Sequence, residues 1–525
     1  MNLGDILIQA SSNHPQEYAL LSGQRKWTFA EVHAAARSLA ERIRETAQRS
    51  PGTPPSTERV ALLVPNCPAF SVAYFATLLA SRVVVPINPL LSDNEIRSIL
   101  LDCRPDLMIF HDRFEERLPS FQDLDFLSFD RVTDLEAFPL EGLKEPTLDP
   151  EKPLPAGFDD TAVVLYTSGS TGDPKGVELT HQNLLSNAMR VSRDKFSTAN
   201  QRQVLGPGQV SLAALPLSHA FGQTNLQNGT WYSGGAIAYC DRFDAEAVVE
   251  QFCTDAITFF AGVPTMYVDL IEAGRRRGPI RTKLRFCVCG GAALAPGMKA
   301  EFREIFGVPI QESYGLTETS PMISCQRVNE TDKSGCVGRA IEGMELRIVD
   351  DRGRPLSAGL EGEIEVRGEN VFKGYLGQEE LNREAFVDGW FKTGDVGYLD
   401  HENELWIVDR KKEMIKRGGY PVYPREIERV ILQAEGIVEV VVLGVPDNRF
   451  GEQIKALVNL RHGEVPIDPG KAVARIRKLC QKKLAAYKQP AIIEVVKSLP
   501  RGSTGKLDRR QLKETHSSQT MEDVS

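Results

Sequence analysis

The chain contains 525 residues, 42% of them hydrophobic and 25% charged, and it carries a net charge of -9 at pH 7. That length exceeds what one hydrophobic core supports, so at least two domains of an ordinary globular protein are expected. A mild negative charge with no basic block excludes a nucleic-acid binder that relies on phosphate contacts. Nine scattered cysteines without a C-x-x-C pair are typical of a protein in a reducing cytoplasm.

No segment of the sequence predicts export or a membrane span. The N-terminus, Met1 to Ala10, contains Asp5 and lacks the basic stretch that begins a secretory signal. The uncharged run Val60 to Ser81 is long enough to be considered as a span, but Pro65 and Pro68 divide it into a strand and a short helix. We therefore expect a cytoplasmic protein, and both a peripheral membrane contact and a homodimer are compatible with its sequence.

The first quarter of the chain predicts a parallel sheet covered by helices. Trp27 to Ile43 has apolar residues at helical spacing, with Thr28 as the N-cap. Strand and helix patterns then alternate over five segments: Arg59–Val64, Ala69–Ala80, Val83–Ile87, Ser92–Leu101 and Leu107–His111. Because residues 113–158 show weak periodicity, we assign them no function.

The stretch Tyr166 to Gly176 combines three glycines, four Ser or Thr hydroxyls and one lysine. Ala162 to Leu165 predicts a buried strand before it, and Leu179 to Met189, opened by Thr180 as an N-cap, predicts a helix after it. A glycine-rich turn between strand and helix directs backbone N–H groups at an anion, and Lys175 adds positive charge. The stretch therefore predicts a phosphate loop. It is not a P-loop, because a glycine follows the lysine where that pattern needs Ser or Thr.

An uncharged segment, Gln203 to Cys240, has the composition of a pocket wall. Apart from the mostly neutral His219 it contains no charged side chain, yet it is rich in Gly, Ser, Thr, Asn and Gln. Two further apolar runs, Phe259 to Tyr267 and Phe286 to Ala293, include glycines at which a ligand can approach the backbone closely.

Short strands dominate after Val337, over Glu345–Val349, Gly362–Arg367 and Glu404–Asp409. Beyond Arg410 a basic, glycine-rich loop leads into a compact α+β unit. Its predicted elements are a helix, two strands, a basic helix and a strand, over Arg425–Gln433, Val438–Leu443, Gln453–Leu460, Lys471–Leu484 and Ile492–Val496. The polar tail after Leu512 predicts disorder.

The expected fold class is α/β. Residues 1–409 form a large N-terminal domain of helix-covered parallel sheets plus a β-rich subdomain, and residues 410–525 form a small, mobile α+β C-terminal domain.

Five motifs follow one another along the chain: Tyr166-Thr-Ser-Gly-Ser-Thr-Gly-Asp-Pro-Lys-Gly, Ser313-Tyr-Gly-Leu-Thr-Glu-Thr, Lys392-Thr-Gly-Asp-Val-Gly, Asp409-Arg-Lys-Lys-Glu-Met-Ile-Lys-Arg-Gly-Gly and Pro500-Arg-Gly-Ser-Thr-Gly-Lys-Leu. Together they resemble the adenylate-forming superfamily of acyl-CoA synthetases, peptide adenylation domains and luciferases. Within it the chain is most similar to bacterial long-chain fatty-acid and coumarate-type ligases. The resemblance implies an enzyme that uses ATP and Mg²⁺ to join a carboxylic acid to AMP and then transfers the acyl group to CoA.

The resemblance places the triphosphate of ATP on the glycine-rich loop, through Thr167, Ser168, Gly169, Ser170, Thr171, Gly172 and Lys175. Thr317 would lie near the α-phosphate, and Glu318 would hold magnesium through its carboxylate. A solvated acid at the start of a helix is the alternative for Glu318.

For the nucleoside, the resemblance implies a slot formed by Gly291, Ala292, Ala293, Ser313, Tyr314 and Gly315, with the Tyr314 ring against the adenine. Asp395 would accept hydrogen bonds from the ribose hydroxyls, assisted by Arg410, because a carboxylate suits a diol. Plain core packing is the alternative for the tyrosine.

Two further residues of the resemblance concern the acid. Lys506, in a Gly/Ser-rich loop, would enter the site and stabilise charge on the carboxylate and phosphate oxygens. His219 resembles the family histidine that gates the acyl pocket. A core histidine satisfied by backbone groups is the alternative.

The thioester step would use the C-terminal domain after a rotation about a hinge at Lys412. Lys416 would approach the carbonyl, while Gly418 and Gly419 let the pantetheine arm of CoA pass close to the backbone. A solvated basic loop is the alternative for both lysines.

The uncharged pocket wall favours an acid without an ammonium group, and small residues such as Gly222 and Gly262 favour a medium or long acyl chain. An aromatic acid–CoA ligase of coumarate or benzoate type is one alternative. An acyl-AMP ligase that loads an acyl carrier protein is another. A non-catalytic nucleotide-binding protein is disfavoured, because Lys506 and Glu318 are both present.

Overall fold

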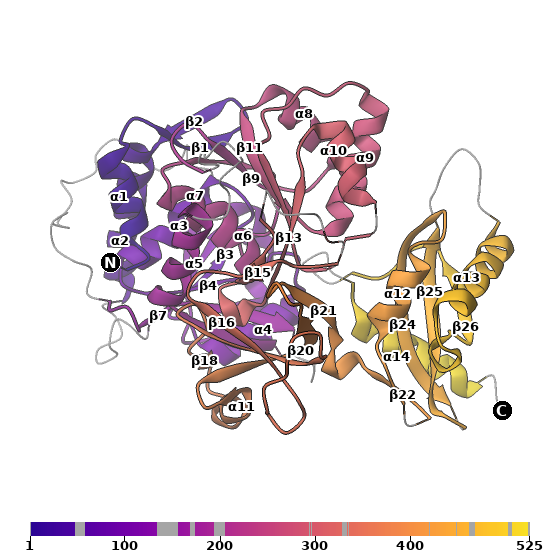
Figure 1. The fold of residues 1–525 in the computed structure, drawn as a ribbon. Coiled ribbons are helices and arrows are strands. Elements are labelled where there is room, and N and C mark those ends of the chain that lie inside the picture. Colours follow the sequence, from indigo (N-terminus) through magenta and orange to yellow (C-terminus); the bar gives the residue numbers. More distant parts are fainter. Residues whose placement is uncertain are drawn as a thin grey trace.

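The structure of the chain is a computed structural model, and it describes residues 2–47, 58–133, 156–168, 174–193, 205–292, 294–295, 297–327, 333, 335–418, 420–447, 449–460, 468–501 and 507–522. Three sheets form the large part of the molecule, and a fourth belongs to a small part, orange to yellow in Figure 1, that lies beside it. None of the helices in these ranges has both the length and the apolar character that crossing a membrane requires.

A seven-stranded sheet has the order β18-β8-β7-β4-β3-β5-β6. Its strands are β3 (Arg59–Leu63), β4 (Val83–Pro86), β5 (Leu107–His111), β6 (Ser128–Val132), β7 (Thr161–Ser168), β8 (Pro174–Thr180) and β18 (Gly374–Tyr375). The strands from β3 to β7 are parallel, whereas β8 and β18 add antiparallel strands at one edge. The helical elements that contact this sheet include α2 (Phe29–Ala47), α3 (Pro68–Leu79), α4 (Asp93–Cys103), η2 (Asp112–Phe121) and α5 (His181–Arg193).

A nine-stranded sheet has the order β15-β14-β13-β12-β11-β9-β10-β1-β2, with β2, β14 and β15 antiparallel to their neighbours. Its strands are β1 (Tyr18–Ser22), β2 (Arg25–Thr28), β9 (Val210–Ala213), β10 (Ala236–Tyr239), β11 (Ile257–Gly262), β12 (Phe286–Cys289), β13 (Ile310–Gly315), β14 (Met322–Cys325) and β15 (Arg339–Ala340). The helical elements around it are α1 (Asp5–Asn13), α6 (Ala220–Gly222), the π-helix η4 (Gln223–Asn228), α7 (Gly229–Tyr232), α8 (Ala245–Thr254), α9 (Pro264–Arg277), α10 (Met298–Phe306) and the 3₁₀ turn η5 (Thr317–Thr319).

The two remaining sheets have five strands each. One consists of β16 (Met344–Val349), β17 (Gly362–Gly368), β19 (Phe386–Val387), β20 (Trp390–Leu399) and β21 (Leu405–Arg410), with α11 (Glu379–Ala385) beside it. The small part follows with η6 (Lys411–Glu413), β22 (Ile415–Arg417), β23 (Tyr420–Val422), α12 (Pro424–Ile431), β24 (Ile437–Asp447), β25 (Gly451–Leu460), α13 (Pro469–Lys483), η7 (Ala486–Lys488), β26 (Ile492–Val496) and α14 (Arg509–Glu522).

The uncharged run that resembles a membrane span forms the core helix α3. All twelve of its side chains are buried. It contacts β3 and β4 of one sheet and β1 of the other, so both of its faces meet protein. A helix that is apolar on every side is stable in such a place, which explains its composition.

The α/β fold class expected from the sequence is confirmed, including the helix-covered parallel sheets, the β-rich subdomain and the small α+β part. Thr28 caps α2 as predicted, because its hydroxyl accepts the Glu31 N–H while Glu31 accepts the Thr28 N–H at 2.7 Å. The helix starts two residues later than predicted, since Trp27 belongs to β2. The domain boundary after residue 409 stays a prediction.

The prediction of a disordered tail after Leu512 was wrong, because α14 continues to Glu522. Polarity favours disorder only when a segment has nothing to pack against. Here Leu512 is buried in a cluster of the small part, and His516 Nδ1 lies 3.1 Å from Lys455 Nζ of β25. A few anchored side chains on one helix face therefore order a polar segment.

The N-terminal helix is attached to the seven-stranded sheet through a buried histidine. The backbone N–H of Leu3 donates to His181 Nδ1 at 3.1 Å, and His181 is 2% exposed. Burial lowers the pKa of His181 from 6.5 to about 4, against the opposing attraction of Asp160. The folded chain therefore holds this imidazole neutral, while the unfolded chain protonates it as the pH falls below 6.5.

We expect stability to fall between pH 6.5 and 4, because only the unfolded state takes up the His181 proton in that window. His181→Gln keeps an acceptor but removes the titration, so the pH dependence of its unfolding free energy should be shallower by about 3 kcal/mol at most over this window. Urea denaturation at several pH values measures this slope. His401→Gln, at an exposed turn, is the control, and identical slopes for His181→Gln and the unmodified chain would contradict the assignment.

Candidate active site

The predicted phosphate loop connects two antiparallel strands rather than a strand and a helix. In the β7–β8 hairpin Thr167 pairs with Lys175, and helix α5 starts only after β8. The expectation of a helix N-terminus behind the loop was therefore wrong, because residues 174–180 form β8, which pairs antiparallel with β7. Thr180 still caps α5, with its hydroxyl accepting the Asn183 N–H at 3.1 Å. The loop residues Gly169, Ser170, Thr171 and Gly172, and the side chain of Ser168, lie outside the described residues.

A tyrosine that the sequence analysis did not single out connects Lys175 with Glu318. Lys175 Nζ lies 5.8 Å from the centre of the Tyr375 ring, and the Tyr375 hydroxyl donates to Glu318 Oε1 at 2.9 Å. Burial, followed by the nearby carboxylate, raises the pKa of Tyr375, so its hydroxyl keeps its proton and stays a donor. Strand β18 pairs with β8, which brings this ring beside the hairpin. Only the pairing of residues far apart in sequence could have revealed it.

The turn after β13 carries two more predicted residues. Thr317 is buried and Glu318 half-buried in η5. Gly315, just before them, allows the chain to turn sharply, since a Cβ there would lie 1.8 Å from the carbonyl oxygen of Pro321. The Leu316 N–H donates to that same carbonyl at 2.9 Å. Any side chain at position 315 would therefore displace the turn that presents Thr317 and Glu318.

The buried carboxylate of Asp395 contacts two other predicted nucleoside residues. The Tyr314 hydroxyl donates to Asp395 Oδ2 at 2.6 Å, and Arg410 Nε lies 3.0 Å from Asp395 Oδ1. Asp395 is 3% exposed, and it sits opposite Arg410 in the β20–β21 ladder. Burial and the adjacent carboxylate raise the pKa of Tyr314 well above its usual value. The structure thus brings the predicted adenine and ribose residues into direct contact.

Small residues surround the Tyr314 strand on its other side. The Ser313 hydroxyl donates to the Cys289 carbonyl at 3.3 Å, and a Cβ on Gly290 would lie 3.0 Å from the Ser313 oxygen. Gly291 adopts a left-handed φ of 84°, and Ala292 beside it is exposed. Gly291 and Ala292 are thus exposed next to the buried Gly290, and the predicted adenine slot stays a prediction. Ala293 lies outside the described residues.

His219 is half-buried and caps the short helix α6, because its Nδ1 accepts the Phe221 N–H at 3.2 Å. The Phe221 ring in turn lies against Gly290, whose Cβ would meet it at 3.1 Å. This backbone contact agrees with the alternative of a satisfied histidine. The gating role of His219 stays a prediction.

The predicted hinge residue lies between two ion pairs that point in opposite directions. Lys411 Nζ lies 3.1 Å from Glu363 of the large part, whereas Glu413 lies 3.1 Å from Lys513 of α14. Lys412 between them is exposed. Although the residue as a whole is exposed, desolvation of its ammonium group, followed by the positive charge of Arg410, lowers the pKa of Lys412. Position 412 is thus where the anchoring of the chain changes from one part to the other.

The predicted CoA residues have described contacts only within the small part. The Lys416 N–H donates to Glu452 at 2.6 Å while its side chain is exposed. Gly418 has a left-handed φ of 58°, and its N–H donates to the Phe450 carbonyl at 2.7 Å. Gly419 and Lys506 lie outside the described residues, so their roles stay predictions.

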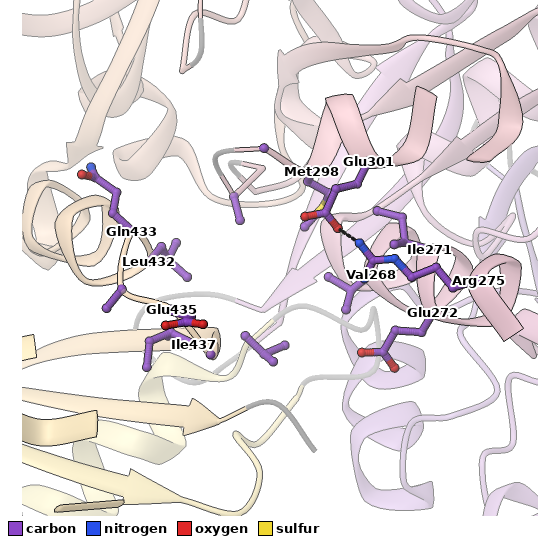
Figure 2. Close-up of a pocket in the computed structure, with 15 residues that line it drawn as sticks. Val268, Ile271, Glu272, Arg275, Met298, Glu301, Leu432, Gln433, Glu435 and Ile437 are labelled. Atoms are coloured by element: carbon purple, nitrogen blue, oxygen red, sulfur yellow. Dashed lines mark hydrogen bonds and ion pairs between the residues drawn. The ribbon is translucent and has the colours of Figure 1, made fainter. Parts of the chain in front are cut away.

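A cleft of about 530 Å³ separates α9 and α10 from the turn between α12 and β24. Figure 2 shows Arg275 and Glu301, joined by an ion pair, on one side of it and Leu432, Glu435 and Ile437 on the other. The residues that line the cleft include none of the predicted site residues. It marks the boundary between the two parts rather than the place of the chemistry.

Carboxylates gather at a second place, where Asp400, Glu402 and Glu404 lie close enough to share an ion. The ammonium of Lys333 already occupies the centre, at 2.6 Å from Glu402 and 3.1 Å from Asp400. Lys333 thus bridges all three carboxylates of the β20–β21 turn as their shared cation. Glu318 is the better candidate to hold a metal, because it lies beside the Lys175 hairpin.

Comparison with known proteins identifies the family of this chain. Residues 7–376 match the family described as AMP-binding enzyme, and residues 426–506 match the AMP-binding enzyme C-terminal domain. A long-chain-fatty-acid–CoA ligase of Bacillus subtilis is 31% identical, with 98% of this chain and 94% of that one aligned. A feruloyl-CoA synthase of Amycolatopsis sp is 33% identical over 96% of this chain and 97% of that one. The crystal structure of ATP-bound MatB from Rhodopseudomonas palustris, 28% identical, superposes with a TM-score of 0.84 over 98% of this chain and 99% of that one.

Asp395→Asn is expected to weaken ATP binding about 10- to 100-fold, because the carboxylate that pairs with Arg410 and is predicted to accept the ribose hydroxyls becomes a weaker neutral acceptor. Isothermal titration calorimetry measures the dissociation constant directly. Glu345→Gln, which removes an exposed carboxylate paired with Arg367, is the matched control. Equal ATP affinity of Asp395→Asn and the unmodified chain, within about twofold, would exclude the nucleoside role.

Proposed function

This chain belongs to the AMP-binding family of adenylate-forming enzymes and is an ATP-dependent acid–CoA ligase, and on that premise we propose that it activates a medium- or long-chain fatty acid. The observation that carries the adenylation chemistry is the contact of Asp395 with Arg410 and with Tyr314, whose strand β13 leads into Thr317 and Glu318. A carboxylate that can bind the ribose, next to a turn that can contact the phosphates, suits a reaction at the α-phosphate of ATP.

In the first step an oxygen of the acid's carboxylate attacks the α-phosphorus. A new P–O bond forms, the bond to the β-phosphate oxygen breaks, and pyrophosphate leaves with that electron pair. Both reactants are anions, so the step needs fixed positive charge and hydrogen-bond donors more than proton transfer. Lys175, the Thr317 hydroxyl and the incoming Lys506 are the proposed donors.

The proposed nucleoside contacts hold the α-phosphate in place. The Tyr314 ring packs on the adenine, and the Asp395 carboxylate accepts the ribose hydroxyls. Since Tyr314 and Arg410 already hold Asp395, the acceptor is oriented before ATP arrives. Such preorganisation lowers the entropic cost of binding in the reactive geometry.

The residues around Glu318 fit a magnesium ion bound to ATP. Mg²⁺ prefers a small number of protein carboxylates together with phosphate oxygens and water. The Glu318 carboxylate is half-buried and is held at Oε1 by Tyr375, which leaves it oriented toward the hairpin side. When bound, the ion would neutralise charge on the phosphate oxygens.

In the second step the CoA thiolate attacks the carbonyl carbon, and AMP leaves with the carboxylate oxygen it received. We propose that residues 410–525 rotate about Lys412 between the steps, so that Lys506 serves the first and the Lys416 to Gly419 loop the second. The opposite anchoring of Lys411 and Glu413 supports this hinge. Both ion pairs involve partly exposed side chains, whose net contribution of about 0–1 kcal/mol is compatible with movement.

The wall from residue 203 to 240 supports an acid without an ammonium group, because it contains no carboxylate to pair with one. A hydroxylated aromatic acid is the second candidate substrate. One observation favours it: the polar side chains of η4 (Gln223, Thr224, Asn225, Gln227 and Asn228) are fully buried. Within the described residues, Gln223 Oε1 and Asn225 Oδ1 accept no hydrogen bond, so a substrate hydroxyl in their reach would find acceptors.

AMP release, measured across acids from acetate to stearate and across hydroxycinnamates, tests the substrate class. We expect the highest kcat/KM for the longer fatty acids, and turnover only when CoA is supplied. Lys506→Ala should lose about 100-fold or more in acid-dependent pyrophosphate release, because one donor to developing charge is removed. A preference for hydroxycinnamates would favour the second candidate, and acyl transfer to a carrier protein without CoA turnover would contradict the proposal.

Lys412→Pro tests the hinge, because proline fixes one backbone dihedral at the position between the two ion pairs. We expect pyrophosphate release to stay within about threefold of the unmodified enzyme while CoA-dependent turnover falls about tenfold or more. Lys412→Ala removes the same side chain but keeps the dihedral free, so it should retain both activities. Normal CoA turnover by the proline variant would exclude rotation about this residue.

A further inference from the structure

Two buried asparagines, far apart in sequence, hold the turn that carries Thr317 and Glu318. Asn187 Nδ2 of α5 donates to the carbonyls of Thr319 and Met322 at 3.1 and 3.4 Å. Asn370 Nδ2, from the segment after β17, donates to the same two carbonyls at 2.8 and 2.9 Å. Both side chains are fully buried. The carbonyls of Thr319 and Met322 therefore each accept hydrogen bonds from two different segments of the chain.

A third donor reaches the turn from the π-helix η4. The Thr224 hydroxyl donates to the Ser320 carbonyl at 2.9 Å, and this side chain is also fully buried. We call Asn187, Thr224 and Asn370 the carbonyl clamp. They come from three different elements and converge on carbonyls that directly follow Glu318.

The asparagines serve as donors alone. Their Oδ1 atoms are buried and have no hydrogen-bond partner among the described residues. An unsatisfied buried acceptor is unfavourable. Positions 187 and 370 therefore need the NH₂ donor of an asparagine, which neither an aliphatic side chain nor a carboxylate provides.

The same helix extends the connection to the phosphate hairpin. Asn183, one turn before Asn187 on α5, donates to the carbonyls of Glu369 and Val371 at 2.7 and 2.8 Å, on either side of Asn370. Helix α5 follows directly after β8, the strand that carries Lys175. Phe372, which follows Val371 in this segment, donates its backbone N–H to the Glu318 carbonyl at 2.8 Å. The hairpin, the segment 369–372 and the turn therefore form one hydrogen-bonded unit.

We propose that Asn187, Thr224 and Asn370 are positioning residues for the adenylation step. The clamp fixes Thr317 and Glu318 relative to the Lys175 hairpin before ATP binds. Charge stabilisation depends steeply on distance, and a misplacement of about 1 Å can cost about 100-fold in rate. The inference rests on the proposed role of Glu318 in the adenylation reaction.

A double-mutant cycle between Asn370→Ala and Glu318→Gln tests the clamp. As a single substitution, Asn370→Ala should lower acid-dependent pyrophosphate release about 30-fold. In the Glu318→Gln background the same substitution should lower it less than about threefold, because the carboxylate that Asn370 positions is already absent. Thioester formation from supplied acyl-adenylate should stay within about threefold in all variants. The dissociation constant of ATP, measured by calorimetry, gives a second readout and should show the same non-additivity.

Thr224→Val keeps the shape but removes the hydroxyl, and it should lower pyrophosphate release about threefold to tenfold, with Thr224→Ser restoring it. This pair keeps the test decisive should an asparagine variant not fold. Asn459→Ala is the matched control, because its amide donates to the Lys497 carbonyl at 2.9 Å in the small part, and it should leave pyrophosphate release unchanged.

Equal losses from Asn370→Ala in both backgrounds, or equal loss of the two half-reactions, would overturn the clamp and leave a purely structural role. Should Glu318→Gln alone retain full activity, the proposed role of Glu318 fails first, and the clamp with it. An impaired Glu318→Gln with additive losses counts against the clamp only.

Discussion

The carboxylate of Asp395 joins two sheets of the molecule. It accepts the Tyr314 hydroxyl from β13 of the nine-stranded sheet and the Arg410 guanidinium from β21, the strand that pairs with its own strand in the β-rich sheet. A carboxylate that is 3% exposed requires such donors, because a buried polar group left without a partner costs about 1–3 kcal/mol and a charged one costs more. Because β21 leads directly to Lys412, the proposed nucleoside contact and the proposed hinge depend on one anchor.

The two reaction steps make opposite demands, and different interactions meet them. Adenylation needs donors and charges at fixed distances, and around Glu318 the turn is held by fully buried amides and a buried hydroxyl. The proposed rotation before thioester formation needs weak contacts, and around Lys412 the contacts are ion pairs between partly exposed side chains. Buried hydrogen bonds resist displacement, whereas surface ion pairs break and form again at small cost. Rigidity and mobility are thus separated along the chain.

Local patterns predicted most elements, including the strand Leu107–His111 and the N-caps at Thr28 and Thr180, because spacing and capping are encoded in neighbouring residues. The sequence also indicated that Tyr314, Asp395 and Arg410 act together, but only through motifs of a known family. Long-range pairing was not predictable. Tyr375 reaches Glu318 because β18 pairs with β8, and α14 is ordered because His516 contacts Lys455.

The central claim is that the acid's own carboxylate oxygen becomes bonded to the α-phosphorus of ATP. An acid labelled with oxygen-18 in both carboxylate positions tests this most directly, with mass spectrometry of the AMP formed during CoA-dependent turnover. The account predicts that each AMP carries a single heavy oxygen and that the thioester keeps the other. Unlabelled AMP, or label appearing in inorganic phosphate together with ADP, would contradict it.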